Sequence, residues 1–155
     1  VIIPAPYWVT YPELVKYCGG VVVELETHDY TAFKITPEQL KDVITPKTKM
    51  LVLTTPSNPT GSVYSKEELK ALGKVLEGTD IIVASDEMYE KLIYKGTFTS
   101  AAAVSEDMFK RTVTINGLSK SVAMTGWRFG YMAAYDSELI KATKKLQSQS
   151  TSNIN

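Results

Sequence analysis

Lys120 and Arg128 are the residues whose types and spacing most clearly allow chemistry. Lys120 ends a mostly apolar run that begins at Thr112, and Arg128 follows eight residues later. A lysine placed where a buried strand ends tends to lose its proton, and a neutral amine can attack a carbonyl carbon. Arg111 and Arg128 are the only arginines among 17 basic residues, and the planar fork of arginine suits a phosphate group. An amine that bonds an aldehyde, beside a phosphate clamp, is what pyridoxal phosphate requires.

Four other residues carry weaker signals, and each has an ordinary structural explanation. Asp86 could cap a helix, or it could hold a proton on a heterocyclic nitrogen through a charge-assisted hydrogen bond. Tyr89, one helical turn later, would lie on the same side or belong to the core. Asn58 lies in the turn-like run 55–61. Trp8 is either a core residue or a flat surface on which an aromatic ligand stacks.

The elements that must position these residues alternate between strands and helices. Nearly continuous apolar runs predict buried strands at 1–4, 21–25, 50–54, 81–85 and 112–115, with a weaker sixth at 130–135. Such strands, separated by helices, indicate an α/β fold: a three-layer α/β/α arrangement around a mostly parallel sheet covered on both faces.

Capping signals mark the helices between these strands. Thr36 and Ser65 each begin a capping box, and an apolar stripe follows each. Pro12 is predicted to begin a short helix that ends at the glycine pair 19–20, and Ser137 is predicted to cap the last helix. No repeat, linker or low-complexity segment is visible, so residues 1–155 are treated as one domain.

The candidate residues follow neighbouring strands at the same edge of the predicted sheet. Asn58 follows the third strand, Asp86 ends the fourth and Lys120 follows the fifth. Ligands of parallel sheets bind beyond the carboxyl ends of the strands. We therefore expect these three side chains to converge on one crevice.

Composition excludes several functional classes. The chain has 155 residues, 44% of them apolar, and a formal net charge of zero, so no electrostatic case exists for nucleic acid or anionic membrane as a partner. No apolar run approaches the roughly 20 residues that span a bilayer. Cys18 is alone, which excludes an internal disulfide and favours a reducing, cytoplasmic location. With His28 the only histidine, a histidine-based triad or a multi-histidine metal site has little support.

The ends of the chain suggest a piece of a longer polypeptide. It opens on an apolar strand without an initiator methionine and ends on the polar run 150–155. We expect a segment before it and a further domain after it.

Four motifs together resemble one family, the class I aminotransferases, which are fold type I pyridoxal phosphate enzymes. The segment GLSK through GWRFG (117–130) resembles the cofactor-attachment signature of that family. SNPTG (57–61) and DEMY (86–89) look like two further motifs in the right order, and PYW (6–8) resembles the ring-stacking segment. The resemblance covers essentially the whole chain. It implies that residues 1–155 are the central part of the large, cofactor-binding domain.

The resemblance implies a catalytic role for three residues. Lys120 would bond covalently to pyridoxal 5′-phosphate and later carry a proton between the substrate and the cofactor. Asp86 would keep the pyridine nitrogen protonated, so that the ring accepts electrons. Tyr89, together with Asn58, would hydrogen-bond the phenolic oxygen of the ring.

The remaining implied roles concern binding. Arg128 would bind the phosphate with help from Ser119, and Trp8 would stack on the ring or contact the substrate carboxylate, as Asn58 also could. The Asn58-Pro59 peptide bond is expected to be cis, as in many relatives.

The chain also departs from the family pattern. Some relatives carry a phosphate-binding serine at the position of Gly117. A glycine-rich helix start, a substrate-binding arginine of the small domain and a tyrosine of the partner subunit cannot lie in this chain. We therefore expect a homodimer in the full-length protein and little activity from this piece alone.

The resemblance favours transfer of an amino group from aspartate to 2-oxoglutarate in two half-reactions. Two alternatives remain open: β-elimination or carbon–sulfur cleavage on the same fold, and a ligand-sensing regulatory module that serves a DNA-binding partner. A serine–lysine hydrolase needs a serine three residues before the lysine, where this chain has Gly117.

Overall fold

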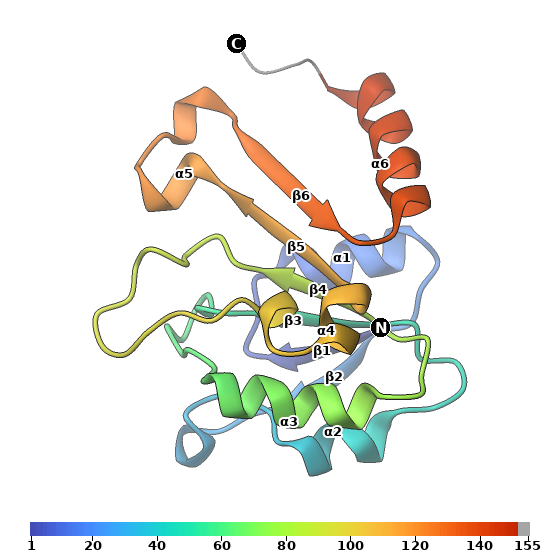
Figure 1. The fold of residues 1–155 in the computed structure, drawn as a ribbon, viewed down its shortest axis with the longest axis vertical. Helices are drawn as coiled ribbons and strands as arrows, with labels where there is room; N and C mark the ends of the chain where they lie inside the picture. The colour runs from blue at the N-terminus through green and yellow to red at the C-terminus, as the bar shows by residue number, and fades with distance from the viewer. Residues whose placement is uncertain (152–155) are drawn as a thin grey trace.

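The computed structural model describes residues 1–151, and within them six strands form a single sheet in the order β2-β1-β3-β4-β5-β6 (Figure 1). Neighbouring strands from β2 to β5 pair in parallel, and β6 pairs with β5 in the antiparallel direction. The predicted α/β fold with a mostly parallel sheet is therefore confirmed. The end of the polar run, residues 152–155, lies outside the described part of the chain.

Each predicted strand is present, with small shifts of its ends. The strands are β1 (Ile2–Ala5), β2 (Val23–Glu26), β3 (Met50–Thr54), β4 (Ile82–Asp86), β5 (Thr112–Gly117) and β6 (Gly130–Ala134). The α-helices are α1 (Thr10–Tyr17), α2 (Pro37–Val43), α3 (Lys66–Leu76), α4 (Glu106–Arg111), α5 (Leu118–Ser121) and α6 (Ser137–Ser150). Three short 3₁₀ turns are η1 (Asp29–Thr31), η2 (Ala101–Ala103) and η3 (Thr125–Trp127).

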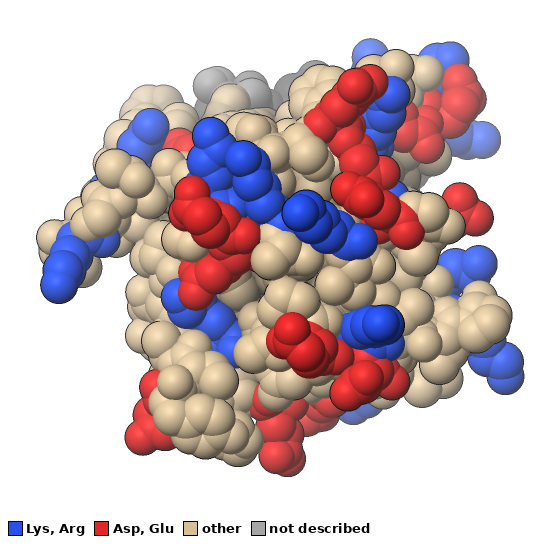
Figure 2. Space-filling model, turned by 60° about the horizontal axis from the view of Figure 1, so that its bottom comes forward, with Lys and Arg blue, Asp and Glu red and all other residues tan. Residues whose placement is uncertain are grey.

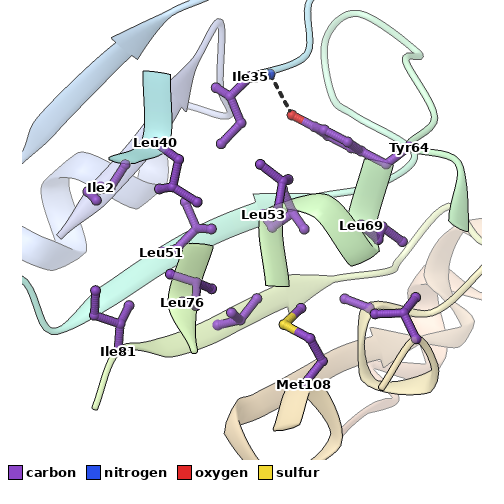
Figure 3. Close-up of a cluster of buried hydrophobic side chains, with 14 of the residues drawn as sticks. Ile2, Ile35, Leu40, Leu51, Leu53, Tyr64, Leu69, Leu76, Ile81 and Met108 are labelled. Carbon is purple, nitrogen blue, oxygen red and sulfur yellow. Dashed lines mark hydrogen bonds between the residues drawn. The ribbon is translucent and has the colours of Figure 1, made fainter. Parts of the chain in front are cut away.

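The main core lies on the face of the sheet that α2, α3 and α4 cover. Successive side chains of a strand point to opposite faces, and in β3 Leu51 and Leu53 belong to this buried cluster whereas Val52 does not. Figure 3 shows Leu53 near Leu69 of α3 and Met108 of α4, and Leu51 between Leu40 of α2 and Leu76 of α3. The other face of the sheet therefore remains for α1 and for the functional side chains.

The helix caps are mostly those that the sequence predicts. The Thr36 and Ser65 side chains accept hydrogen bonds from the third backbone N–H of α2 and α3, and both capping boxes are complete. Two predictions are wrong. Helix α1 begins at Thr10, two residues before Pro12, and Asp136 caps α6 in place of Ser137. The Asp136 carboxylate accepts from the backbone N–H groups of Glu138 and Leu139.

The β5–β6 edge of the sheet is partly exposed in the described chain. Ile115 of β5 is 40% exposed and Leu146 of α6 is 70% exposed. Helix α6 contributes no fully buried side chain. The reason is that α6 lies beside the end of β6 and does not extend over the face of the sheet (Figure 1).

The charges on the surface shown in Figure 2 are of both signs. Figure 2 shows positive and negative side chains intermixed on the face that carries α2 and α3. Among residues 1–151, no helix combines the length and apolarity needed to cross a membrane. In the same residues no group of three histidine, cysteine, aspartate or glutamate side chains could hold a metal ion.

Thr112 at the start of β5 offers a test of the packing. Its hydroxyl is buried and has no hydrogen-bond partner among the described residues, whereas the equally buried Thr55 hydroxyl accepts from the backbone N–H of Tyr64. We expect Thr112→Val to raise the free energy of unfolding of the full-length protein by about 1 kcal/mol, because an unsatisfied polar group disappears. Thr55→Val, the matched control, should lower it by about 1–3 kcal/mol. Urea unfolding measures both changes, and equal effects of the two substitutions would contradict this account.

Candidate active site

Three of the predicted residues meet beyond the carboxyl ends of β3, β4 and β5. The Asn58 side-chain amide lies 3.4 Å from the Tyr89 hydroxyl, to which it donates. The Lys120 amine lies 5.9 Å from the centre of the Tyr89 ring. The three strands are in register at this edge, since Thr54 pairs with Asp86 and Asp86 with Ile115. Asn58 and Lys120, two of the three residues expected to converge, thus both lie against Tyr89. Asp86, the third, is hydrogen-bonded to Tyr11 and to the Met88 N–H.

Asp86 is the last residue of β4 and lies on the face opposite the main core. Its Oδ2 accepts a hydrogen bond of 2.5 Å from the Tyr11 hydroxyl, and its Oδ1 accepts from the backbone N–H of Met88 at 3.1 Å. The Thr54 hydroxyl donates to the Tyr11 oxygen at 3.2 Å. Burial, and then the Asp86 carboxylate, raise the pKa of Tyr11. Tyr11 therefore keeps its proton at neutral pH and serves as a fixed donor to the acid.

Sequence reasoning did not identify Tyr11. A signal was available, because Tyr11 lies three residues after Trp8 at the start of a helix. The chain turns between them, since the Tyr11 N–H donates to the Trp8 carbonyl at 3.2 Å, and this turn brings the two side chains together. The motif considered ended at Trp8, so the partner of Asp86 went unnoticed.

Trp8 packs against Tyr11, the hydrogen-bond partner of Asp86. The two rings meet edge to face, with centroids 5.7 Å apart and planes at 89°. Trp8 is 48% exposed, so a large flat surface remains available next to Tyr11. Such a surface suits an aromatic ligand.

Lys120, Ser119 and Arg128 lie on one short segment, α5 to η3. The Thr125 hydroxyl donates to the Ser119 carbonyl at 3.0 Å, and the Arg128 guanidinium donates to the Thr125 carbonyl at 2.9 Å. Arg128 adopts a left-handed backbone conformation with φ of +52°. Non-glycine residues seldom adopt it, and they often do so at functional sites.

The expectation that Lys120 is desolvated is wrong for the described chain, in which Lys120 is exposed. Helix α5 has a single turn and lies at the outer end of β5, away from α2 and α3 (Figure 1). Burial of this amine therefore needs atoms that residues 1–151 do not provide.

The turn after β3 is built around Asn58. The Asn58-Pro59 bond is cis, as predicted, and Ala5-Pro6 and Thr55-Pro56 are cis as well. The turn closes through hydrogen bonds from the Ser57 N–H to the Ser62 carbonyl and from the Gly61 N–H to the Ser57 carbonyl. Gly61 has φ of +72°, a conformation that favours glycine. These contacts hold the Asn58 amide toward Tyr89.

Gly117 is tightly packed where β5 and β6 meet. A Cβ atom there would lie 2.7 Å from the Phe129 carbonyl oxygen, which is backbone and cannot move freely. We expect Gly117→Ser to lower the free energy of unfolding of the full-length protein by about 1–3 kcal/mol. The displaced segment would include Lys120, so the substitution should also shift the position of the Lys120 amine.

Gly130, the partner of Gly117 in the register, provides the control for that substitution. A Cβ atom at Gly130 would meet its nearest neighbour, the Asn116 carbonyl oxygen, at 3.4 Å, an ordinary contact. Gly130→Ala should therefore change stability much less than Gly117→Ser in urea unfolding. Equal losses of stability in the two variants would contradict the prediction.

Comparison with known proteins identifies the family of the chain. The sequence profile of the family described as aminotransferase class I and II matches residues 1–154. The chain is 55% identical to an aspartate aminotransferase of Geobacillus stearothermophilus over 154 residues, which are 99% of this chain and 39% of that protein. It is 50% identical to an aspartate/prephenate aminotransferase of Nitrosomonas europaea, covering 100% of this chain and 39% of the relative.

A solved structure shows the same fold. The aspartate aminotransferase of Thermus thermophilus with maleate superimposes with a TM-score of 0.92 at 46% identity, over 99% of this chain and 39% of that one. The chain thus spans about two fifths of the length of the relatives that it matches. Because the family profile covers nearly all of it, the chain belongs to the aminotransferases of class I and II.

Proposed function

We propose that the full-length protein is a pyridoxal phosphate-dependent aminotransferase, and that residues 1–155 form the central part of its large domain. One observation carries this proposal. The Lys120 amine lies against the Tyr89 ring, and the Tyr89 hydroxyl contacts the Asn58 amide, in a chain that belongs to this family. An amine, a phenol and an amide at one sheet edge are the groups that such a site requires.

The donor set of the site fits the chemistry of pyridoxal phosphate. When bound, this cofactor supplies an aldehyde carbon and a ring that takes up the electron pair released at the substrate Cα. Lys120 would hold the aldehyde carbon and, once released, move the proton at Cα. Asp86, held by Tyr11 and the Met88 N–H, would bind the protonated ring nitrogen through a charge-assisted hydrogen bond.

The other side chains would orient the cofactor. Asn58 and Tyr89 would donate to the phenolic oxygen of the ring, and the exposed face of Trp8 would stack on it or contact the substrate carboxylate. Arg128, with Ser119, would bind the phosphate through its planar fork. The Arg128 guanidinium is exposed and bonds a backbone carbonyl, so it can exchange that partner for a phosphate.

For the substrates we propose aspartate as the amino donor and 2-oxoglutarate as the acceptor. The names of the relatives support aspartate as the donor, and the Thermus structure contains maleate, which carries two carboxylates as aspartate does. We further propose that the protein is a cytoplasmic homodimer and that a second carboxylate-binding group lies outside this chain. Residues 1–155 alone would then have little activity.

A screen of amino donors on the full-length protein tests this function. Each candidate donor, labelled with ¹⁵N, is incubated with 2-oxoglutarate, and the products are identified by mass. We expect stoichiometric transfer of the label from aspartate to glutamate. Release of free ammonia or sulfide without labelled glutamate would show elimination, and binding without turnover would show a sensing module. Either outcome would contradict the proposal.

A further inference from the structure

Glu87 is a buried acid that none of the proposed steps uses. It directly follows Asp86, is only 2% exposed, and takes part in none of the ion pairs found among residues 1–151. Asp86 faces α1, and alternation along the strand turns Glu87 toward the face of η2 and α4. A buried carboxylate without a counter-charge is unfavourable unless hydrogen bonds hold it.

One oxygen of Glu87 accepts three hydrogen bonds. Its Oε1 lies 2.9 Å from the Ser85 hydroxyl, 2.9 Å from the Ser100 hydroxyl and 3.1 Å from the Ala101 N–H. Burial raises the pKa of the Glu87 carboxyl, although these three donors act in the opposite direction. The carboxylate thus joins the end of β4 to the start of η2.

These bonds close the segment 88–99, which leaves β4, extends away from the sheet and returns to η2 (Figure 1). Its far part is exposed, with Leu92 at 40% and Tyr94 at 99%. Tyr89 stands near its beginning, and the contacts of its side chain are loose: 3.4 Å to Asn58 and 5.9 Å to the Lys120 amine. Contacts of this length do not fix the position of a tyrosine by themselves.

We propose that Glu87 is a positioning residue, whose buried carboxylate ties together both ends of segment 88–99 and thereby holds Tyr89 against Asn58 and Lys120. The inference deepens the proposed function and rests on it. Glu87 touches neither substrate nor cofactor. It acts by keeping the Tyr89 hydroxyl where the phenolic oxygen of the ring would accept its hydrogen bond.

The test uses the near-visible absorbance band of the full-length protein with its lysine-bound cofactor. A donor at the phenolic oxygen lowers the pH at which this band changes, so Tyr89→Phe should raise the midpoint by about 0.5–1 pH unit, the size of one lost hydrogen bond. We expect Glu87→Ala to raise it by a similar amount. The double variant Glu87→Ala/Tyr89→Phe should shift no further than Tyr89→Phe alone, because both substitutions remove the same contact.

Two further variants separate positioning from a general loss of stability. Glu87→Gln keeps an acceptor oxygen, so its midpoint should lie much closer to that of the wild-type protein than the midpoint of Glu87→Ala does. Ser100→Ala removes one of the three donors without touching the site, and should give a smaller shift in the same direction. If Glu87→Ala does not fold, Ser100→Ala carries the test, and an unshifted midpoint would overturn the inference.

Hydrogen exchange on the cofactor-free protein gives a second readout. Glu87→Ala should speed amide exchange across residues 88–101 and leave β3 unaffected. If Tyr89→Phe shifts the midpoint of the absorbance titration and Glu87→Ala does not, the role of Glu87 is overturned and the proposed function stays intact. Absence of the band from the wild-type protein would instead overturn the proposed function, and this inference with it.

Discussion

Replacing Lys120 by alanine in the full-length protein is expected to abolish the near-visible absorbance band and to reduce transamination more than about 10⁴-fold. The loss is large because one amine has two tasks, covalent attachment of the cofactor and transfer of the Cα proton. The position of the amine beside Tyr89, on the single turn of α5, supports both tasks. Absorbance spectra and steady-state rates with aspartate measure the two effects.

Two controls accompany this substitution. Lys74→Ala removes an exposed lysine of α3, remote from the site, and should leave the band and the rate unchanged. Lys120→Arg keeps the positive charge and removes the nucleophile, so it should lose the band as Lys120→Ala does. A band that persists in Lys120→Ala would remove this residue from the mechanism.

Asp86→Ala is expected to reduce turnover by about 10²–10³-fold while the protein stays folded. Two donors, Tyr11 and the Met88 N–H, hold the Asp86 carboxylate, so the orientation of this group is fixed. Loss of one such preorganised group has an effect of this size in other enzymes. Asp86→Asn should be nearly as impaired, because it keeps the shape of the side chain and loses the charge.

Asp42→Ala is the matched control for this acid, since Asp42 is exposed on α2. Rates with aspartate and circular dichroism spectra of each variant separate chemistry from folding. Near-normal turnover in Asp86→Ala would exclude this residue as the partner of the ring nitrogen.

The local features of the fold could be predicted from the sequence because short-range physics determines them. The continuous apolar run 50–54 is β3 without change, and the capping boxes at Thr36 and Ser65 begin α2 and α3 as predicted. The strand pattern also placed Asn58 and Lys120 at one edge, because parallel strands end together. Each of these features depends on a pattern of only a few neighbouring residues.

The remaining features depend on contacts between distant residues. The bond from Tyr11 to Asp86 joins positions 75 residues apart, and the bond from Ser100 to Glu87 crosses a long loop. Neither follows from spacing along a helix or strand, since each depends on how two elements pack. The exposure of Lys120 in the described chain could not be predicted either, because the burial of a side chain depends on every atom near it. The chain spans only 39% of the length of the Geobacillus relative.

Trapping of the cofactor on the full-length protein tests the central claim most directly. Borohydride reduction fixes the bond between cofactor and lysine, and peptide mass mapping then locates the phosphopyridoxyl group. The account predicts that the group is found on Lys120, with the other lysines unmodified. Modification of a different lysine, or a protein that carries no such group, would contradict it.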